Sequence, residues 1–119
     1  MSKLVFANTH EWAKIEDNVA TIGISDHAQH ELGDLVFINL PAVGDTLTAG
    51  EAFCDVESVK AVSDVMAPIS GKVIEVNEEL ESAPEAINED AMGAWICKVE
   101  VTAVPDDLMD EAAYAEFIK

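Results

Sequence analysis

The residue with the most distinctive chemistry is Lys60, which lies between two short runs of strand-forming residues, DVES at 55–58 and AVSD at 61–64. If these runs pair as antiparallel strands, Val59 and Lys60 form the two-residue connection that hairpins commonly use. The Asn-Gly or Gly-Gly pair that favours such a turn is missing. A primary amine at a turn tip can be reached by a modifying enzyme from nearly every side. An ordinary surface lysine has the same surroundings, so the hairpin alone leaves the role of Lys60 open.

A second group of polar side chains, in the segment SDHAQHELGD, could be considered as a metal site. His27 and His30 stand three residues apart, with Asp26 and Glu31 beside them. Zinc sites use three or four well-placed protein ligands, and the two histidines lack a clear third partner. We therefore interpret these residues as the solvated face of a short helix and expect no bound metal.

The two cysteines, Cys54 and Cys97, lie in apolar, strand-like surroundings, far apart in sequence and outside any CxxC pattern. Unpaired cysteines are among the most frequently buried residues in proteins. We expect two buried free thiols in preference to a disulfide or a shared metal.

The chain that must position these residues consists mainly of short β-like runs bounded by turn residues. Glycine and proline fall mainly between the runs, where loops need a positive or a fixed φ. Strands this short and turns this frequent favour a small sandwich or barrel over βαβ units, which require a helical crossover after each strand. The expected strands are 11–16, 19–24, 35–40, 52–58, 60–67, 71–76 and 95–101.

Helices are predicted at three places. Residues 25–34 have Ser25 or Asp26 as a possible N-cap and Gly33 at the expected end. Residues 76–90 have room for another turn or two, interrupted near Pro84. The tail, about 105–118, begins with a proline and acidic residues, which suit a helix N-terminus, and continues through good helix formers.

The length of the chain limits the number of domains, and its charge limits the kinds of partner that it can bind. The 119 residues, half of them hydrophobic, suffice for one compact core and are short for two, so we expect a single domain over 1–119. Six lysines, with no arginine, face 24 acidic residues, which gives a formal net charge of -18. Nucleic acid and anionic membranes would repel such a chain. The acidity serves solubility, docking on basic partner proteins, or both.

The sequence also lacks the features of a targeted or membrane-spanning chain. Its first twelve residues contain no apolar stretch followed by a small-residue cleavage site, and no run approaches the roughly 18 apolar residues that a membrane span requires. We expect a soluble, cytoplasmic protein, and a monomer.

A wider similarity surrounds Lys60. It is carried by ESVKAVSD at 57–64 and APISG at 67–71, which closely resemble the lipoyl-lysine segment of the H-protein family of the glycine cleavage system. The similarity continues over almost the whole chain, through HEW at 10–12, the segment 19–51, GKVIEVNEEL at 71–80, INED at 87–90, and a closing Trp95 with an acidic helix. One difference is the loop NEDAMGAW, about a residue shorter than in relatives and without their Pro-aromatic pair, which leaves the local loop shape open.

The resemblance implies both a fold and a cofactor. The fold is mainly β: a barrel-sandwich hybrid of two small antiparallel sheets, with short helices and a C-terminal helix, and with the lipoyl hairpin around 55–65. Lys60 would carry lipoate in amide linkage, and the residues flanking it would form the motif that lipoate-attaching enzymes recognise, namely Glu57, Ser58, Val59 and Ala61. The protein would be a carrier, not an enzyme.

The resemblance further implies the partners of the carrier. A pyridoxal-phosphate-dependent glycine decarboxylase would load the aminomethyl group of glycine onto the arm. A tetrahydrofolate-dependent aminomethyltransferase would then take its carbon and release ammonia, and dihydrolipoamide dehydrogenase would reoxidise the dithiol. A swinging arm raises the effective concentration of the intermediate at each partner without releasing it.

Three further residues would lie beside the parked, cationic arm: Thr9, Glu11 and Asp64. Carboxylates suit this role, because a partly desolvated ammonium gains from charge-assisted hydrogen bonds. The two acids could equally be solvated surface groups, since acidic residues are abundant here and most are expected to be exposed.

Two alternatives remain open on the sequence alone. One is another modified carrier, either a biotinyl domain, whose lysine typically lies between methionines, or the lipoyl domain of a 2-oxo acid dehydrogenase, which usually has aspartate before the lysine. Val59 and Ala61 stand at these positions here. The other alternative is an acidic interaction module that is never modified at Lys60.

Overall fold

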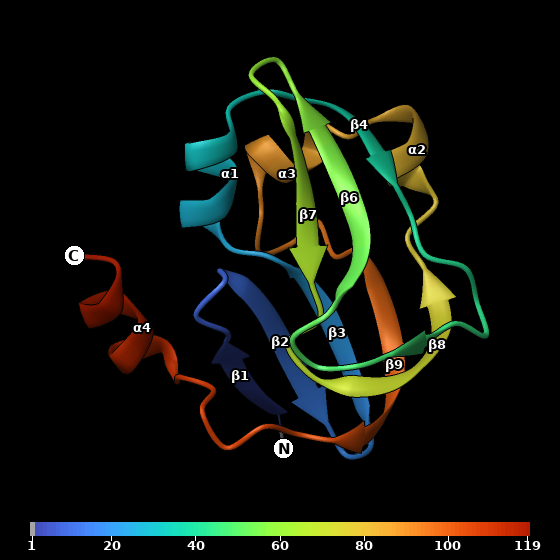
Figure 1. Ribbon diagram of the computed structural model, residues 1–119, viewed down its shortest axis with the longest axis vertical. Helices are drawn as coiled ribbons and strands as arrows, with labels where there is room; N and C mark the ends of the chain where they lie inside the picture. The colour runs from blue at the N-terminus through green and yellow to red at the C-terminus, as the bar shows by residue number, and fades with distance from the viewer. Residues whose placement is uncertain (1) are drawn as a thin grey trace.

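Two antiparallel sheets form the framework of the computed structural model, which describes residues 2–119 (Figure 1). The larger sheet has the strand order β1-β2-β3-β9-β8-β5, and the smaller one has the order β4-β6-β7. The mainly β fold expected from the sequence is confirmed. The strands are β1 Ser2–Phe6, β2 Glu11–Glu16, β3 Val19–Ile24, β4 Leu35–Asn39, β5 Thr46–Leu47, β6 Ala52–Ser58, β7 Val62–Met66, β8 Ser70–Val76 and β9 Cys97–Ala103.

The core lies between the sheets and follows from the alternation of side chains along the strands. In β6, for example, Cys54 and Val56 are buried, whereas Glu57 is exposed. The buried cluster draws on both sheets, so that Ile22 of β3 and Ile38 of β4 belong to the same core. Most strands were predicted to within two residues, because each is a run of strand-forming residues bounded by turn residues.

Two strands were not predicted. β1 pairs with β2 from Ser2 opposite Glu16 to Phe6 opposite Trp12, and β5 contributes only Thr46 and Leu47 to the edge beside β8. Both are edge strands of the larger sheet. A two-residue strand is too short to show a periodic pattern, because it is defined by its partner and not by its own residues.

The first helix, α1 Asp26–Leu32, confirms the sequence prediction and identifies its cap. Ser25 is the N-cap, because its side-chain oxygen accepts the backbone N–H of Ala28 at 3.1 Å. The helix ends at Gly33, which has φ 83° and ψ -165°, a conformation that is essentially restricted to glycine. The short helices α2 Glu79–Ser82 and α3 Ala86–Glu89 flank Pro84, as expected.

The C-terminal helix is shorter than the expected 105–118. It is α4 Glu111–Phe117, with Asp110 as the N-cap whose carboxylate accepts the N–H of Ala113 at 2.8 Å. The helix cannot begin at 105, because Met109 exchanges two backbone hydrogen bonds with Phe6 of β1, at 2.7 and 2.8 Å. The acidic residues after Pro105 therefore lie in a loop that extends the sheet edge.

The loop before Trp95, whose shape the sequence left open, is a compact turn. Gly93 donates its backbone N–H to the carboxylate of Asp90 at 3.2 Å. The indole N–H of Trp12 donates to the carbonyl oxygen of Ala91 at 3.2 Å, so the loop is also anchored on β2. Within residues 2–119, the helices are all too short or too polar to cross a membrane.

Candidate functional site

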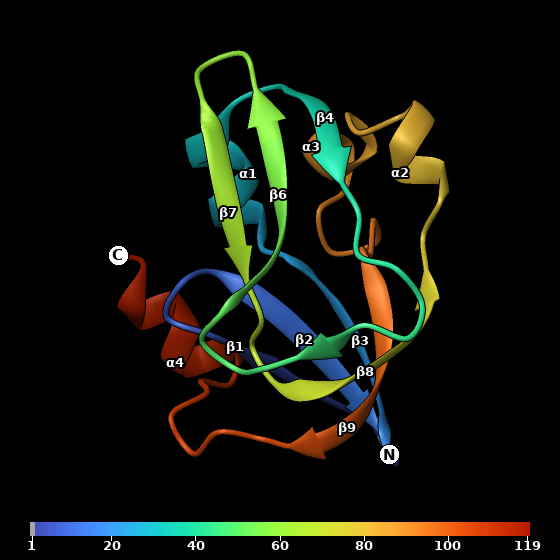
Figure 2. The same cartoon turned by 45° about the vertical axis from the view of Figure 1, so that its right-hand side comes forward.

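The site is built around the β6–β7 hairpin, whose tip projects beyond the rest of the molecule (Figure 2). Lys60 is at this tip and is exposed. Three residues, Val59, Lys60 and Ala61, separate the two strands, one more than expected. The reason is that Ala61 donates its N–H to the hydroxyl oxygen of Ser58, at 3.2 Å, instead of completing the ladder.

Ser58 therefore takes over the role that an Asn-Gly pair would have. Its hydroxyl oxygen also accepts the N–H of Lys60 at 3.1 Å, and its hydroxyl donates to the carbonyl oxygen of Ala61 at 3.2 Å. None of the three tip residues has a positive φ. The Ser58 side chain and the backbone hydrogen bond from Ser58 N–H to the carbonyl oxygen of Ala61, at 2.8 Å, therefore hold the turn. Neither contact depends on the side chain at position 60.

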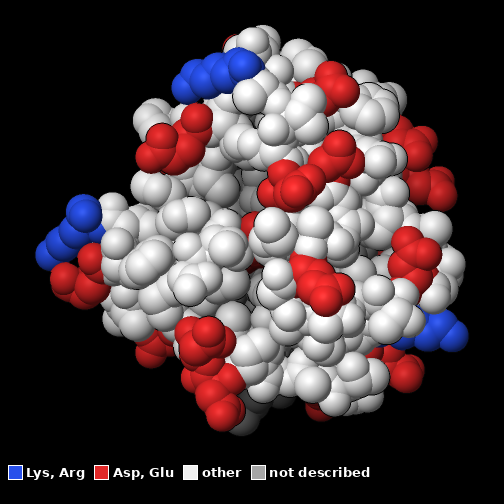
Figure 3. All heavy atoms as spheres, in the orientation of Figure 1, with Lys and Arg blue, Asp and Glu red and all other residues white. Residues whose placement is uncertain are grey.

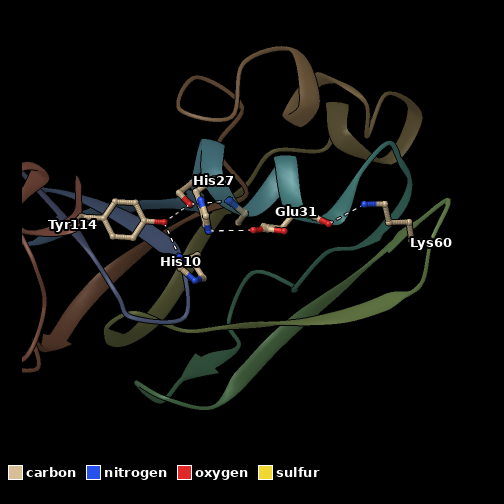
Figure 4. Close-up of polar contacts among 7 residues, drawn as sticks. His10, His27, Glu31, Lys60 and Tyr114 are labelled. Carbon is tan, nitrogen blue, oxygen red and sulfur yellow. Dashed lines mark hydrogen bonds and ion pairs between the residues drawn. The ribbon is translucent and has the colours of Figure 1, made fainter. Parts of the chain in front are cut away.

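The tip rests on the C-terminal end of α1. Val59 donates its N–H to the carbonyl oxygen of Asp34 at 2.9 Å, and the Lys60 ammonium lies 3.4 Å from the carbonyl oxygen of Glu31 (Figure 4). The unpaired carbonyls at a helix C-terminus attract a cation. The lysine side chain is therefore laid back along the helix end in this structure.

Gly33 and Asn88 complete the seat of the hairpin, and sequence reasoning missed both roles. A β-carbon on Gly33 would lie 3.3 Å from Cε of Lys60, so the glycine leaves room for the lysine stem. Asn88 donates to the carbonyl oxygen of Gly33 at 2.9 Å and accepts the N–H of Leu35 at 2.8 Å. Only the glycine carried a signal in the sequence, as the end of a helix.

Between α1 and the hairpin lies a cleft with a volume of about 200 Å³. The structure brings Thr9, Glu11 and Asp64 together along its wall, together with Glu31, whose carbonyl oxygen contacts Lys60. The apolar part of the wall comes from Ile24, Ala28, Leu32, Val56 and Val65. Residues 55 positions apart in sequence are therefore neighbours in one partly apolar site.

The two acids in the cleft have different environments. Glu11 is only 4% exposed, whereas Asp64, on the edge strand β7, is exposed. The hydroxyl of Thr9 donates to one oxygen of Glu11, and the N–H of Met66 donates to the other at 3.2 Å. Burial raises the pKa of Glu11 to about 7, against the opposing effect of these hydrogen bonds. Glu11 is therefore a buried group that is partly protonated near neutral pH.

A hydrogen-bond chain from the C-terminal helix fixes the loop that carries Thr9 and leads into Glu11 at the start of β2 (Figure 4). The Tyr114 hydroxyl lies 2.7 Å from Oγ of the buried Ser25 and 2.8 Å from Nδ1 of His10. Burial, and then the neighbouring His27, lower the pKa of His10, so Nδ1 of a neutral ring can accept a hydrogen bond from the tyrosine hydroxyl. His10 has φ 79°, an unfavourable value for a non-glycine residue. This tie to Tyr114 was not visible in the sequence.

Of the two histidines of α1, only His27 is less solvated than expected. His27 is half-buried, lies 3.6 Å from the carboxylate of Glu31 and packs on His10 with ring centroids 4.7 Å apart, whereas His30 is exposed. Within residues 2–119, no three His, Cys, Asp or Glu side chains come together as a metal site.

Both cysteines are buried free thiols, as predicted. Burial raises the pKa of Cys97 to about 12 and that of Cys54 further. Neither is a thiolate at neutral pH, and both belong to the core cluster.

The protein has a lipoyl-domain-like fold, with two antiparallel sheets and a lysine at the tip of a projecting hairpin. A crystal structure of a glycine cleavage system H protein from Mycobacterium marinum superposes with a TM-score of 0.90 at 40% identity, covering 96% of this chain and 94% of that one.

Comparison of sequences gives the same result. The family model described as Glycine cleavage H-protein matches residues 4–119. The chain is 54% identical over 116 residues to the glycine cleavage system H protein of Alkaliphilus oremlandii, covering 96% of this chain and 91% of that relative. It is 52% identical over 120 residues to a probable H protein of Pyrococcus abyssi, covering 98% and 90%. The chain belongs to the glycine cleavage H-protein family.

Proposed function

We propose that Lys60 carries lipoate and that the loaded arm shuttles the aminomethyl group of glycine from glycine decarboxylase to the aminomethyltransferase. Dihydrolipoamide dehydrogenase then restores the oxidised arm. The observation that carries this proposal is the position of Lys60, which is exposed at a hairpin tip and contacts Glu31, a residue that lines a cleft with a buried carboxyl group.

The residues present fit the attachment of such a group. The neutral amine of Lys60 attacks the carbonyl carbon of an activated lipoyl group, which forms the amide, releases a proton and expels the activating group with its bonding electrons. The surroundings of Lys60 leave the stem free to swing, because the one polar contact of its ammonium within residues 2–119 is the 3.4 Å approach to the Glu31 carbonyl oxygen. When bound, the dithiolane supplies the thiol-disulfide chemistry that accepts the aminomethyl group.

The cleft has the chemistry needed to shelter a cationic cargo. Part of its wall is apolar, and Glu11 and Asp64 offer carboxyl oxygens near Thr9. An ammonium group that enters the cleft would favour the ionised form of Glu11 and so lower its raised pKa. A partly desolvated ion pair of this kind is worth more than the same pair in water.

The test is intact-mass spectrometry of the protein after incubation with lipoate, ATP and a lipoate-protein ligase. We expect a single lipoyl addition to the wild type and none to Lys60→Arg, whereas the matched control Lys72→Arg should be modified like the wild type. Lys60→Arg should also fold normally and fail to support glycine-dependent transfer to tetrahydrofolate.

An unmodified wild type, or an addition at another lysine, would contradict the proposal. That outcome would favour the alternative of an unmodified acidic interaction module. Addition of biotin in place of lipoate by the corresponding ligase would instead favour a biotinyl carrier.

A further inference from the structure

The outer face of the three-stranded sheet carries a mixed apolar and acidic surface next to Lys60. Residues that pair across antiparallel strands share a face, and the pairing places Phe37, Glu57 and Val62 in one row. The next row on the same face, further from the hairpin tip, contains Asp55 opposite Asp64. We call these five residues the hairpin face.

The hairpin face exposes two large apolar side chains, Phe37 and Val62, to solvent. Phe37 is 49% exposed and Val62 is 61% exposed, although the residues that alternate with them, such as Ile38 and Val56, are fully buried in the core. Figure 3 shows this side of the molecule, on which acidic side chains are scattered over the surface while basic ones lie only at the margins. Exposed aromatic residues beside charged groups are typical of protein interfaces.

The charges on the hairpin face repel one another. Asp55 and Asp64 stand directly opposite each other on β6 and β7, with Glu57 one row away, and like charges in this arrangement are destabilising. The ion pairs found within residues 2–119 all involve other side chains. A partner with cationic side chains would relieve this repulsion, so the face is complementary to a basic surface with an apolar centre.

The position of the face indicates which partner covers it. Glu57 lies three residues before Lys60 and Val62 two residues after it. An enzyme that attaches lipoate must bring the Lys60 amine into its own active site, so it must contact the hairpin close to the tip.

We infer that the hairpin face is the docking surface for the lipoate-attaching enzyme, with Phe37 and Val62 as apolar anchors and Asp55, Glu57 and Asp64 facing cationic side chains. This inference rests on the proposed function. Because Phe37 belongs to β4, outside the hairpin, the enzyme recognises the folded sheet as well as the residues that flank the lysine in sequence.

The test compares Phe37→Ser with the control Ile74→Ser, which removes an apolar side chain of similar exposure, 44%, from β8. The measurement is the steady-state rate of lipoate attachment by a purified ligase, as a function of the concentration of the carrier. We expect Phe37→Ser to raise KM roughly tenfold with kcat nearly unchanged, as for a hot-spot residue, and Ile74→Ser to leave both constants unchanged.

A second variant keeps the test sharp. Val62→Ser removes the other anchor from a more exposed position and should raise KM in the same way, even if the first variant unfolds. Asp55→Asn should weaken the dependence of KM on salt, because it removes one of the charges that attract the ligase and that salt screens. The urea midpoint of each variant shows whether it is folded.

Three outcomes would overturn the inference. In the first, both Phe37→Ser and Val62→Ser are folded and are modified with the wild-type KM. In the second, the fully lipoylated variants show a raised KM with glycine decarboxylase while attachment is normal, which would assign the face to the decarboxylase. In the third, the wild type itself accepts no lipoate, and the proposed function fails together with the inference.

Discussion

The raised pKa of the buried Glu11 predicts how the free energy of unfolding depends on pH. Its pKa is raised from 4.5 to about 7 by burial, so between these values the folded protein holds a proton that the unfolded chain has lost. Under this condition the free energy of unfolding falls by about 1.36 kcal/mol per pH unit as the pH rises. Between pH 4.5 and pH 7 the protonation of Glu11 therefore changes the free energy of unfolding by about 3 kcal/mol. This stability is fully present below pH 4.5 and is lost as the pH rises through 7.

Glu11→Gln isolates this contribution from that of the other acidic residues. An amide can keep both contacts of the carboxyl group, since its oxygen can accept the N–H of Met66 and its NH₂ can donate to Thr9. The variant cannot ionise. We therefore expect its stability relative to the wild type to increase by about 3 kcal/mol between pH 4.5 and pH 8.

The assay is urea denaturation of both proteins at several pH values across this range, with the difference in unfolding free energy plotted against pH. Glu16→Gln, at the exposed end of the same strand, is the matched control and should stay within about 0.5 kcal/mol of the wild type. A difference between the wild type and Glu11→Gln that is constant with pH, or that changes in the opposite direction, would refute the reasoning.

Three other substitutions test the structure around the site. Gly33→Ala should destabilise the fold by about 1–3 kcal/mol and slow lipoate attachment. The control Gly44→Ala is also at a positive φ but has open space around it, so it should affect attachment little. Equal attachment rates for the two variants would contradict the role of Gly33. Tyr114→Phe should cost about 1–2 kcal/mol in urea denaturation, because Ser25 and His10 lose their shared partner while the ring remains stacked on Phe6. Ser58→Ala should change global stability by less than about 1 kcal/mol but accelerate hydrogen exchange of the amides at the hairpin tip, and unchanged exchange there would count against the turn described above.

The strands and the hairpin could be predicted because their signals are local. Runs of strand-forming residues bounded by turn residues located β2, β3 and β6 with the observed bounds. The helix cap at Ser25 and the stop at Gly33 were likewise visible as residue types at fixed positions. The start of the last helix was misplaced because Pro105 and the acidic residues after it suit a helix N-terminus, whereas the pairing of Met109 with Phe6 keeps the segment before Asp110 out of the helix.

The sequence by itself determined the period of the strands, the place of Lys60 at a hairpin tip and, through the surrounding motif, the family resemblance. It could not show that Glu11 is buried, because burial depends on which elements cover a residue, and α1 and β7 come from other parts of the chain. Nor could it show that Tyr114 holds His10 across 104 positions. The tertiary structure decided these points, since a pKa, a seat for the lysine and a surface for docking all arise from contacts between residues that are distant in sequence.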